Sequence, residues 1–385
     1  MKALKSIFFM LFFVLICSEQ ILFFMPNFAS KPLAGAYSIP NKPKLTLPNW
    51  FNNNFQDSLI NYFEFNLKLH NLYVRSNNQI NFNLFNQSAA KMVLVGKHHQ
   101  IFEDYYIDSY IGKDYLGVDT IKKRTSALAE LQKELASKNI TLVTLIAPAK
   151  SSIYPQDIPN NYPGLEKKTT TNYDTYIKEF KHQKINFIDF RNYFLQIKNK
   201  VNHPLFSNLG THWNGYGSSL AADSLIHYLE KIRNIDMVDC VIEKGYTTQE
   251  PKYYDNDLMD LLNLMYKLPC NQLYYPNIKF KDDQSKYKPK AILIGDSFSW
   301  AWIHTYPFFQ NIFDKDSEFW YYNNVIYFAN NGAYAANKIV DSSTLSEKIK
   351  NQDFIILLFN EHNLFEFDFN VSKNLKQAMK ENSLQ

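Results

Sequence analysis

Two polar residues stand where an α/β sheet places its chemistry: Ser297 and His212. Ser297 lies in a Gly-Asp-Ser turn directly after the apolar run 291–294, and such a turn exposes its hydroxyl at the carboxyl end of a buried strand. His212 lies 85 residues earlier and precedes Trp213. A serine hydroxyl becomes a good nucleophile when a nearby histidine accepts its proton. The pair therefore predicts acyl chemistry, with Ser297 as nucleophile and His212 as base.

Each residue also has a simpler interpretation. A Gly-Asp-Ser sequence is typical of an ordinary strand-to-helix turn in which the aspartate or the serine caps a helix. A single histidine among 9 can equally be a half-buried residue that is hydrogen-bonded to the backbone. The surrounding segments favour the catalytic interpretation over these alternatives.

Six segments stand in order along residues 31–364. They are Lys31-Pro32-Leu33-Ala34-Gly35; Val93-Leu94-Val95-Gly96-Lys97 with Ile101-Phe102 and Tyr106; Ile146-Ala147-Pro148-Ala149-Lys150 with Tyr154-Pro155; His212-Trp213-Asn214 with Tyr216-Gly217; Gly295-Asp296-Ser297-Phe298; and Asn360-Glu361-His362-Asn363-Leu364. Together they resemble the SGNH-hydrolase-like polysaccharide O-acetyltransferases of the alginate acetylation type (AlgX/AlgJ-like). In ordinary SGNH hydrolases the Gly-Asp-Ser block lies near the amino terminus and the histidine near the carboxyl terminus. In this chain the order is reversed, as in that acetyltransferase family.

The resemblance implies an O-acetyltransferase that moves an acetyl group through a serine acyl-enzyme onto hydroxyls of an exported polysaccharide. It also implies that a membrane-bound acyltransferase supplies the acetyl group. The same residues would serve a carbohydrate esterase in which water is the acceptor, and a non-catalytic polysaccharide-binding protein is a third interpretation. Acyl transfer of this kind requires no cofactor and no metal.

One position departs from the family pattern, which is usually Asp-x-His. The residue two positions before His212 is Gly210, so the carboxylate that would orient the imidazole is missing there. Either another acid takes this role, or the serine and histidine act as a dyad, or activity is weak or absent. The last alternative is the reason for the non-catalytic interpretation. The candidate acids are Asp189, at the end of an apolar run, and Asp296, beside the nucleophile; each can instead be a turn or cap residue.

Four further side chains are candidates for substrate binding. Lys150, after the strand at 141–146, would face the crevice between the loops that carry His212 and Ser297. There it can hold an anionic sugar or support an oxyanion, unless it is a solvated surface residue. Tryptophans near the site, Trp300 included, can stack on sugar rings or belong to the core. The backbone amide of Ser297 is the expected first oxyanion donor, and an asparagine side chain after residue 328 can supply a second. The candidates are Lys150, Trp213, Asn330 and Asn331.

Composition excludes several function classes. The net charge of +4 is small and the lysines are scattered, which argues against a nucleic-acid-binding protein. His98 and His99 form a pair with no third metal ligand near them in sequence, so a metal site is not expected. A hydrophobic fraction of 46% is sufficient for a sizeable core.

The amino terminus predicts export. Lys2 and Lys5 precede an apolar stretch that extends to Met25, interrupted by Glu19. The stretch suits either an uncleaved signal anchor in the inner membrane or a cleaved signal peptide, and both place the protein in the periplasm or outside the cytoplasm. We expect this segment at 1–28, an extended linker at 29–49, a catalytic domain at 50–370 and a carboxyl-terminal tail at 371–385.

Residues 238–288 form a possible insertion near the site within the catalytic domain. Cys240 and Cys270 lie inside it, and in an oxidising compartment they are either a disulfide or two buried thiols. Apolar residues between 50 and 86 recur at helical spacing, and we expect them to form core.

Apolar strands alternate with helices between residues 120 and 358. Such a pattern predicts a doubly wound, mostly parallel α/β sheet that is flanked by helices, and the resemblance implies an SGNH-hydrolase-like version in permuted order. A strand pair is expected at 93–102. The expected strands are 141–146, 185–190, 291–294, 320–328 and 354–358, and the expected helices are 120–137, 170–180, 214–232 and 300–313.

Overall fold

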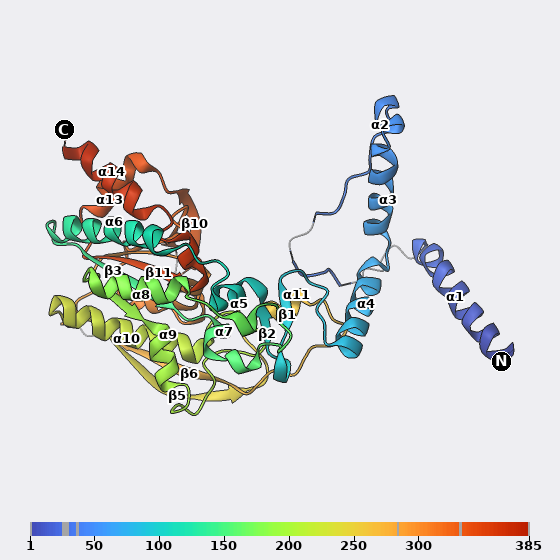
Figure 1. Ribbon diagram of the computed structural model, residues 1–385, viewed down its shortest axis with the longest axis horizontal. Coiled ribbons are helices and arrows are strands. Elements are labelled where there is room, and N and C mark those ends of the chain that lie inside the picture. Colours follow the sequence, from blue (N-terminus) through green and yellow to red (C-terminus); the bar gives the residue numbers. More distant parts are fainter. Residues whose placement is uncertain (1, 25–30, 36–37, 283–284, 331–332, 384–385) are drawn as a thin grey trace. The chain divides into compact units, whose positions relative to one another are not determined.

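The structure of the chain is a computed structural model that describes residues 2–24, 31–35, 38–282, 285–330 and 333–383 (Figure 1). Its internal contacts divide the chain into two compact units. The first consists of the residues up to Val93 together with Met259–Lys267, and the second of Leu94–Leu258 and Leu268–Gln385. Residues 50–93, which the sequence pattern assigns to the catalytic domain, belong to the first unit.

A seven-stranded sheet forms the centre of the second unit, and Figure 1 shows helices packed along it. The five neighbouring strands β8, β7, β11, β3 and β4 run parallel. At one edge β9 pairs antiparallel with both β8 and β10, so β9 runs opposite to the other strands. The predicted α/β class with a mostly parallel sheet is therefore confirmed. In spatial order the strands are β10 (Ala333–Ile339), β9 (Val325–Asn330), β8 (Glu318–Tyr321), β7 (Ala291–Gly295), β11 (Phe354–Asn360), β3 (Thr141–Ala147) and β4 (Phe187–Asp189).

The central strands are apolar on both sides because both faces of the sheet are covered. Along β11, alternate side chains enter two separate cores, and β3 and β7 divide in the same way. On the first face lie Phe354, Ile356 and Leu358, and on the second lie Ile355, Leu357 and Phe359.

Helices close both cores. The first face is covered by α9 (Phe190–Ile197), α10 (Gly215–Arg233), the π-helical turn η5 (Ala301–Thr305) and α12 (Phe308–Ile312). The second face is covered by α6 (Val118–Ala136), α8 (Asn172–His182), α13 (Ser342–Ile349) and α14 (Val371–Ser383).

Two predicted elements are divided in the structure. The expected helix 300–313 becomes η5 and α12, because Pro307 has no backbone N–H to continue the helix. The expected strand 320–328 becomes the hairpin β8–β9, in which Tyr322 and Asn323 adopt left-handed backbone conformations, each with φ of 51°.

Several shorter elements lie outside the seven-stranded sheet. The expected strand pair is present as β1 (Val93–Val95) and β2 (Ile101–Glu103), followed by α5 (Asp104–Ile111), and α7 (Lys150–Ile153) follows β3. The hairpin of β5 (Asp239–Thr248) and β6 (Leu273–Lys281) lies in the predicted insertion. The connection between β5 and β6 contains α11 (Asp257–Leu261).

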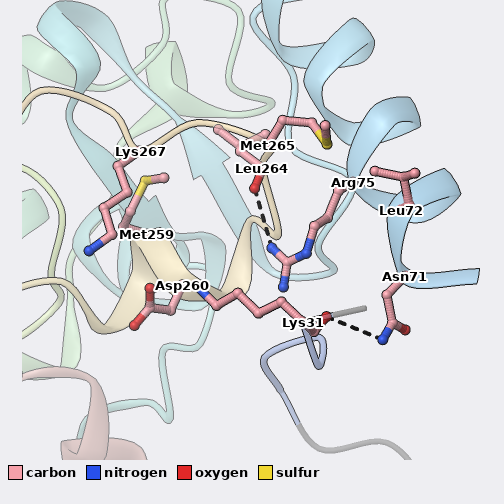
Figure 2. A pocket seen from close by; sticks show the side chains of 9 residues that line it. All are labelled: Lys31, Asn71, Leu72, Arg75, Met259, Asp260, Leu264, Met265 and Lys267. Atoms are coloured by element: carbon pink, nitrogen blue, oxygen red, sulfur yellow. Dashed lines mark hydrogen bonds between the residues drawn. The ribbon is translucent and has the colours of Figure 1, made fainter. Parts of the chain in front are cut away.

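The first unit consists of helices α1 (Lys2–Phe23), α2 (Leu47–Phe51), α3 (Asn54–Asn66) and α4 (His70–Phe85) with residues 259–267. Arg75 on α4 donates hydrogen bonds to the carbonyls of Leu264 and Pro32, beside a pocket that Figure 2 shows. None of the predicted site residues lines this pocket. In the described part of the chain, no helix is both long enough and apolar enough to cross a membrane.

The expectation that the apolar residues of segment 50–86 form core is wrong for most of them. No residue of α3 is buried, and Ile60 and Phe63 are 57% and 59% exposed. Helical spacing gathers apolar residues on one side of a helix, but within the first unit little packs over that side. Leu69 and Phe82 are exceptions and are buried.

Candidate active site

The nucleophile turn lies at the carboxyl end of β7, as the sequence predicts. Ser297 begins the turn η4 (Ser297–Ser299), and its Oγ lies 2.9 Å from Nε2 of His212. Gly295 permits this turn, because a Cβ there would meet Ser299 Oγ at 2.2 Å and the Leu358 carbonyl at 3.2 Å. The predicted contact between serine and histidine is therefore present.

The other nitrogen of the imidazole contacts a carboxylate that the sequence analysis missed. Nδ1 of His212 lies 2.7 Å from Oδ2 of Asp257, at the start of α11. The second oxygen of Asp257 accepts hydrogen bonds from the backbone N–H groups of Thr211 and Leu258, both at 2.9 Å. These bonds fix the carboxylate, so acid, imidazole and hydroxyl form a continuous Asp-His-Ser chain of the kind that activates serine nucleophiles.

Gly210 and Asp257 are two parts of one arrangement. A Cβ at Gly210 would lie 2.9 Å from the carbonyl oxygen of Tyr254 and 3.0 Å from the carbonyl of Asp255. The backbone of the β5–β6 connection thus occupies the space that a side chain at position 210 would need. The same close approach brings Asp257 to the imidazole, so the connection supplies the acid that the family pattern places at position 210.

The two acids predicted to orient His212 have other partners, and that prediction is wrong. Asp189 caps α9 by accepting from the backbone N–H of Asn192 at 2.9 Å, and it also accepts from the Tyr173 hydroxyl at 2.8 Å. A cap at that position requires a short side-chain acceptor, which explains the aspartate there.

Asp296 is completely buried next to the nucleophile and holds the turn rather than the imidazole. Its carboxylate accepts from the backbone N–H of Phe298 at 3.0 Å, and from the Asn360 N–H and the Asn363 amide at 2.6 Å each. Burial raises its pKa, although these hydrogen bonds act in the opposite direction. Asp296 therefore ties the end of β7 to the loop after β11.

Lys150 is not available to bind substrate. Its Nζ is buried and donates to the carbonyls of Ser207, Asn208 and Gly210, at 3.2, 3.3 and 2.5 Å. Burial lowers its pKa to about 7, with nearby carboxylates, Asp257 among them, opposing the shift. The lysine supports the backbone that leads to His212, which corrects the prediction that it faces the crevice.

Trp213 is also part of the framework. It is 2% exposed, and its indole N–H donates to the carbonyl of Phe298 at 3.1 Å, which links the histidine segment to the nucleophile turn. The prediction that it stacks on a sugar ring is therefore wrong, because its ring is buried, stacked on Trp302 and in edge contact with Phe298. Asn331 lies outside the described residues, and so does the side chain of Asn330.

A second carboxylate supports the histidine segment. Glu103, at the end of β2, accepts from the Thr211 hydroxyl at 2.5 Å and from the Tyr105 hydroxyl. Its pKa is raised by burial, which outweighs these hydrogen bonds. Thr211 thereby contacts two acids, with its backbone on Asp257 and its side chain on Glu103.

The surroundings of His212 raise its pKa and so make the imidazole a better proton acceptor. Burial alone would lower the pKa of His212, but the hydrogen bond and charge of Asp257, together with the charges of Glu103 and Asp296, raise it above the ordinary value. A raised pKa makes the neutral imidazole a stronger base for the Ser297 proton.

Tyr322 and Asn363 complete the surroundings of the serine. Burial raises the pKa of Tyr322, whereas hydrogen bonding with the side chains of Asn363 and Ser297 acts to lower it. Asn363 belongs to the motif Asn360–Leu364, which predicts no role for it, and Tyr322 falls within the expected strand 320–328. The left-handed backbone at Tyr322, which belongs to the β8–β9 turn, is not visible in the sequence pattern.

The cysteines of the insertion are free thiols. Cys270 is buried, with its Sγ 3.7 Å from Ser207 Oγ, and Cys240 pairs with Phe280 across the β5–β6 hairpin. Of the two alternatives, the structure has the thiols and not the disulfide. His98 contacts Asp157 at 2.9 Å, and within the described residues no three metal-binding side chains are grouped.

A family model described as "SGNH hydrolase-like domain, acetyltransferase AlgX" matches residues 110–353, more than half of the chain. Among solved structures, the O-acetyltransferase domain of Pseudomonas putida AlgJ is similar, with 18% identity over 74% of this chain and 99% of that one, and a TM-score of 0.48. Pseudomonas aeruginosa AlgX is 14% identical over 74% of this chain and 66% of its own, with a TM-score of 0.48. Bacillus cereus PatB1 is 13% identical, covers 64% and 91%, and has a TM-score of 0.38. No curated protein sequence matches the chain.

Proposed function

The chain belongs to the family of SGNH hydrolase-like acetyltransferase AlgX domains, and from this premise we propose that it transfers an acetyl group through an acyl-enzyme on Ser297 to a hydroxyl of an exported polysaccharide. The observation that carries the proposal is the hydrogen-bonded series Asp257, His212 and Ser297, at 2.7 and 2.9 Å. Family membership supports acetyl transfer, and the geometry supports the serine as the group that carries the acetyl.

The reaction proceeds in two halves. As Ser297 Oγ attacks the acetyl carbonyl, Nε2 of His212 takes the hydroxyl proton and then gives it to the departing donor group. In the second half a sugar hydroxyl gives its proton to the same nitrogen while its oxygen attacks the acetyl-serine carbonyl, and the proton returns to Oγ as the ester is released. Asp257 keeps the proton of Nδ1 in place and stabilises the imidazolium of each half.

The oxyanion that forms in each half requires hydrogen-bond donors close to the serine. We assign this role to the backbone N–H of Ser297 and the hydroxyl of Tyr322, which interacts with the serine side chain. The high pKa of that phenol keeps it protonated at neutral pH, so it can donate.

The setting of the reaction follows from the family resemblance and the amino-terminal sequence. The acceptor is an exported polysaccharide, the donor is a membrane-bound acyltransferase, and the protein works outside the cytoplasm. Lys2 and Lys5 before the apolar segment support export. The absence of an acid at position 210 is the reason for the non-catalytic interpretation. Because Asp257 supplies an acid to His212, this reason no longer applies.

The test uses an activated acetyl ester such as 4-nitrophenyl acetate. Wild-type protein quenched during turnover should carry one acetyl group on the peptide that contains Ser297, detected by mass spectrometry. Ser297→Ala and His212→Ala should lose the adduct and ester turnover while keeping their melting temperatures. Turnover that survives in Ser297→Ala would overturn the proposal. A polysaccharide acceptor should divert acetyl from water, whereas release of free acetate with every acceptor would make the protein an esterase.

A further inference from the structure

Three rings are layered beside the catalytic pair. Tyr254, on the β5–β6 connection, lies 6.2 Å from the His212 ring, measured between centroids. Its hydroxyl and Nδ1 of His304 are 2.9 Å apart, and the two ring planes differ by 28°. His304 in turn stacks on Trp300, with 4.6 Å between centroids and 23° between planes. The series therefore extends from the imidazole to the residue three positions after the nucleophile.

Tyr254 and His304 are exposed, although contacts with neighbouring residues fix the positions of their rings. The turn η5 buries Ala301, Trp302, Ile303 and Thr305 and leaves only His304 exposed. Tyr254 is 38% exposed. Trp300 is half-buried, held edge-on by Phe319 at 4.9 Å and Tyr327 at 4.8 Å, so it forms a rigid base for His304.

The exposed rings carry no charge near neutral pH. Partial burial lowers the pKa of His304, so its imidazole is neutral, and burial raises the pKa of Tyr254. A neutral aromatic surface with polar tips packs against the apolar C–H face of a sugar ring, and its hydroxyl and ring nitrogen can hydrogen-bond the sugar hydroxyls.

The charged groups around the catalytic pair are mainly acidic. Those acting most strongly on the pKa of His212 are Asp257, Glu103 and Asp296. Asp255, whose pKa burial raises to about 7, is also close enough to act on His212. The ammonium of Lys150 is enclosed by backbone carbonyls. A negatively charged sugar placed here would meet like charges, which disfavours binding.

We propose that the acceptor is a polymer of uncharged sugars and that one of its rings lies against Tyr254 and His304 during acetyl transfer. This inference rests on the proposed function, because it assigns the acceptor of the same reaction. Tyr254 lies next to the His212 ring and contacts His304, so a sugar held against these two rings lies beside the catalytic imidazole.

The first test measures partition of acetyl between acceptor and water. With 4-nitrophenyl acetate as donor and a neutral glucan oligosaccharide as acceptor, the ratio of sugar ester to free acetate is measured for the full chain. His304→Ala and Tyr254→Leu should lower this ratio about fivefold to tenfold, with a higher acceptor KM. His304→Phe, which keeps a ring, should retain most of the ratio.

Tyr287→Leu is the matched control. Tyr287 is 46% exposed and hydrogen-bonds Asp353, at the amino end of the sheet, away from the nucleophile turn. This variant should leave ester turnover and the partition ratio unchanged. An unchanged ratio in both His304→Ala and Tyr254→Leu would overturn the ring assignment.

The second test compares acceptors of equal length. The neutral oligosaccharide should be acetylated at least fivefold faster than an oligouronate at low ionic strength, and the difference should shrink as salt screens the charges. Equal or faster acetylation of the oligouronate would overturn the inference that the acceptor is uncharged. These failures differ from failure of the proposed function, because in that case the wild-type protein would form no acetyl adduct on Ser297.

Discussion

The turn that carries Ser297 and the loop that carries Asp257 reach the same imidazole by different routes. The turn follows directly from a central strand, and its main supports lie at strand ends of the sheet: Asp296 directly after β7, and Asn360 at the end of β11. The loop belongs to the connection between β5 and β6, outside that sheet. It meets His212 only because Gly210 has no side chain: a Cβ at that position would lie 2.9 and 3.0 Å from the loop backbone.

This difference distinguishes two parts of the site. The fold itself provides the nucleophile turn, whereas the position of the orienting carboxylate along the chain can vary. Any strand of this sheet that ends in a small polar turn exposes a hydroxyl at the carboxyl edge. The orienting carboxylate has only to reach Nδ1, and it can come from any segment that approaches closely. In this chain the acid lies not two positions before the histidine but in the β5–β6 connection, 45 residues after it.

The largest expected effect comes from removing the relocated acid. Asp257→Asn should lower kcat/KM for acetyl ester turnover about 10³- to 10⁴-fold, because an amide neither stabilises the imidazolium nor selects the Nδ1–H tautomer. Asp260→Asn, an exposed carboxylate on the same helix, is the control and should have no such effect. A loss below tenfold in Asp257→Asn would mean that the serine and histidine work as a dyad.

Placing the family's aspartate at position 210 should lower both the stability and the activity of the protein. Gly210→Asp requires a Cβ where the backbone of residues 254 and 255 lies, so the loop must shift and carry Asp257 away from the imidazole. We expect a loss of about 1–3 kcal/mol in the free energy of unfolding and a fall in kcat/KM of about 10- to 100-fold. Denaturant unfolding and ester kinetics measure the two effects. A kcat/KM above the wild-type value would contradict the assignment of the orienting role to Asp257.

The pH dependence tests the charge of the relocated acid. Only the neutral imidazole can accept the serine proton, so kcat/KM falls as pH drops through the His212 pKa. Because Asp257, Glu103 and Asp296 raise that pKa, the acid limb should lie above 6.5. In Asp257→Asn the residual activity should have its limb at lower pH. A limb at or below 6.5 in the wild type would show that burial outweighs the carboxylates.

Local patterns identify the parts of the site whose geometry is local. The Gly-Asp-Ser turn is predictable because its conformation depends on adjacent residues and on the end of one strand. His212 is predictable because its neighbours match a family motif in the expected order. The parallel sheet is predictable as well, since β3, β7 and β11 are apolar on both faces.

The rest depends on contacts between distant segments. Asp257 lies in a polar stretch, and nothing near it in sequence indicates that its carboxylate meets His212. The strand end that carries Lys150 is predictable, but the direction of its side chain is set by carbonyls 57 to 60 residues later. The sequence shows that Trp213 is aromatic, yet only the packed core shows that its ring is buried.

The smallest effect is expected at Asp189, which lies at the carboxyl end of β4 and whose carboxylate accepts hydrogen bonds from the backbone N–H of Asn192 on α9 and from the Tyr173 hydroxyl. Asparagine caps helices about as well as aspartate, so Asp189→Asn should change unfolding free energy by less than about 1 kcal/mol, with ester kcat/KM within about twofold of wild type. Asp189→Ala removes the cap and should cost about 1 kcal/mol of stability with the same kinetics. If either variant lost activity tenfold while its fold persisted, a position at the edge of the sheet would matter to His212 without contact, and the assignment of the orienting role to Asp257 alone would fail.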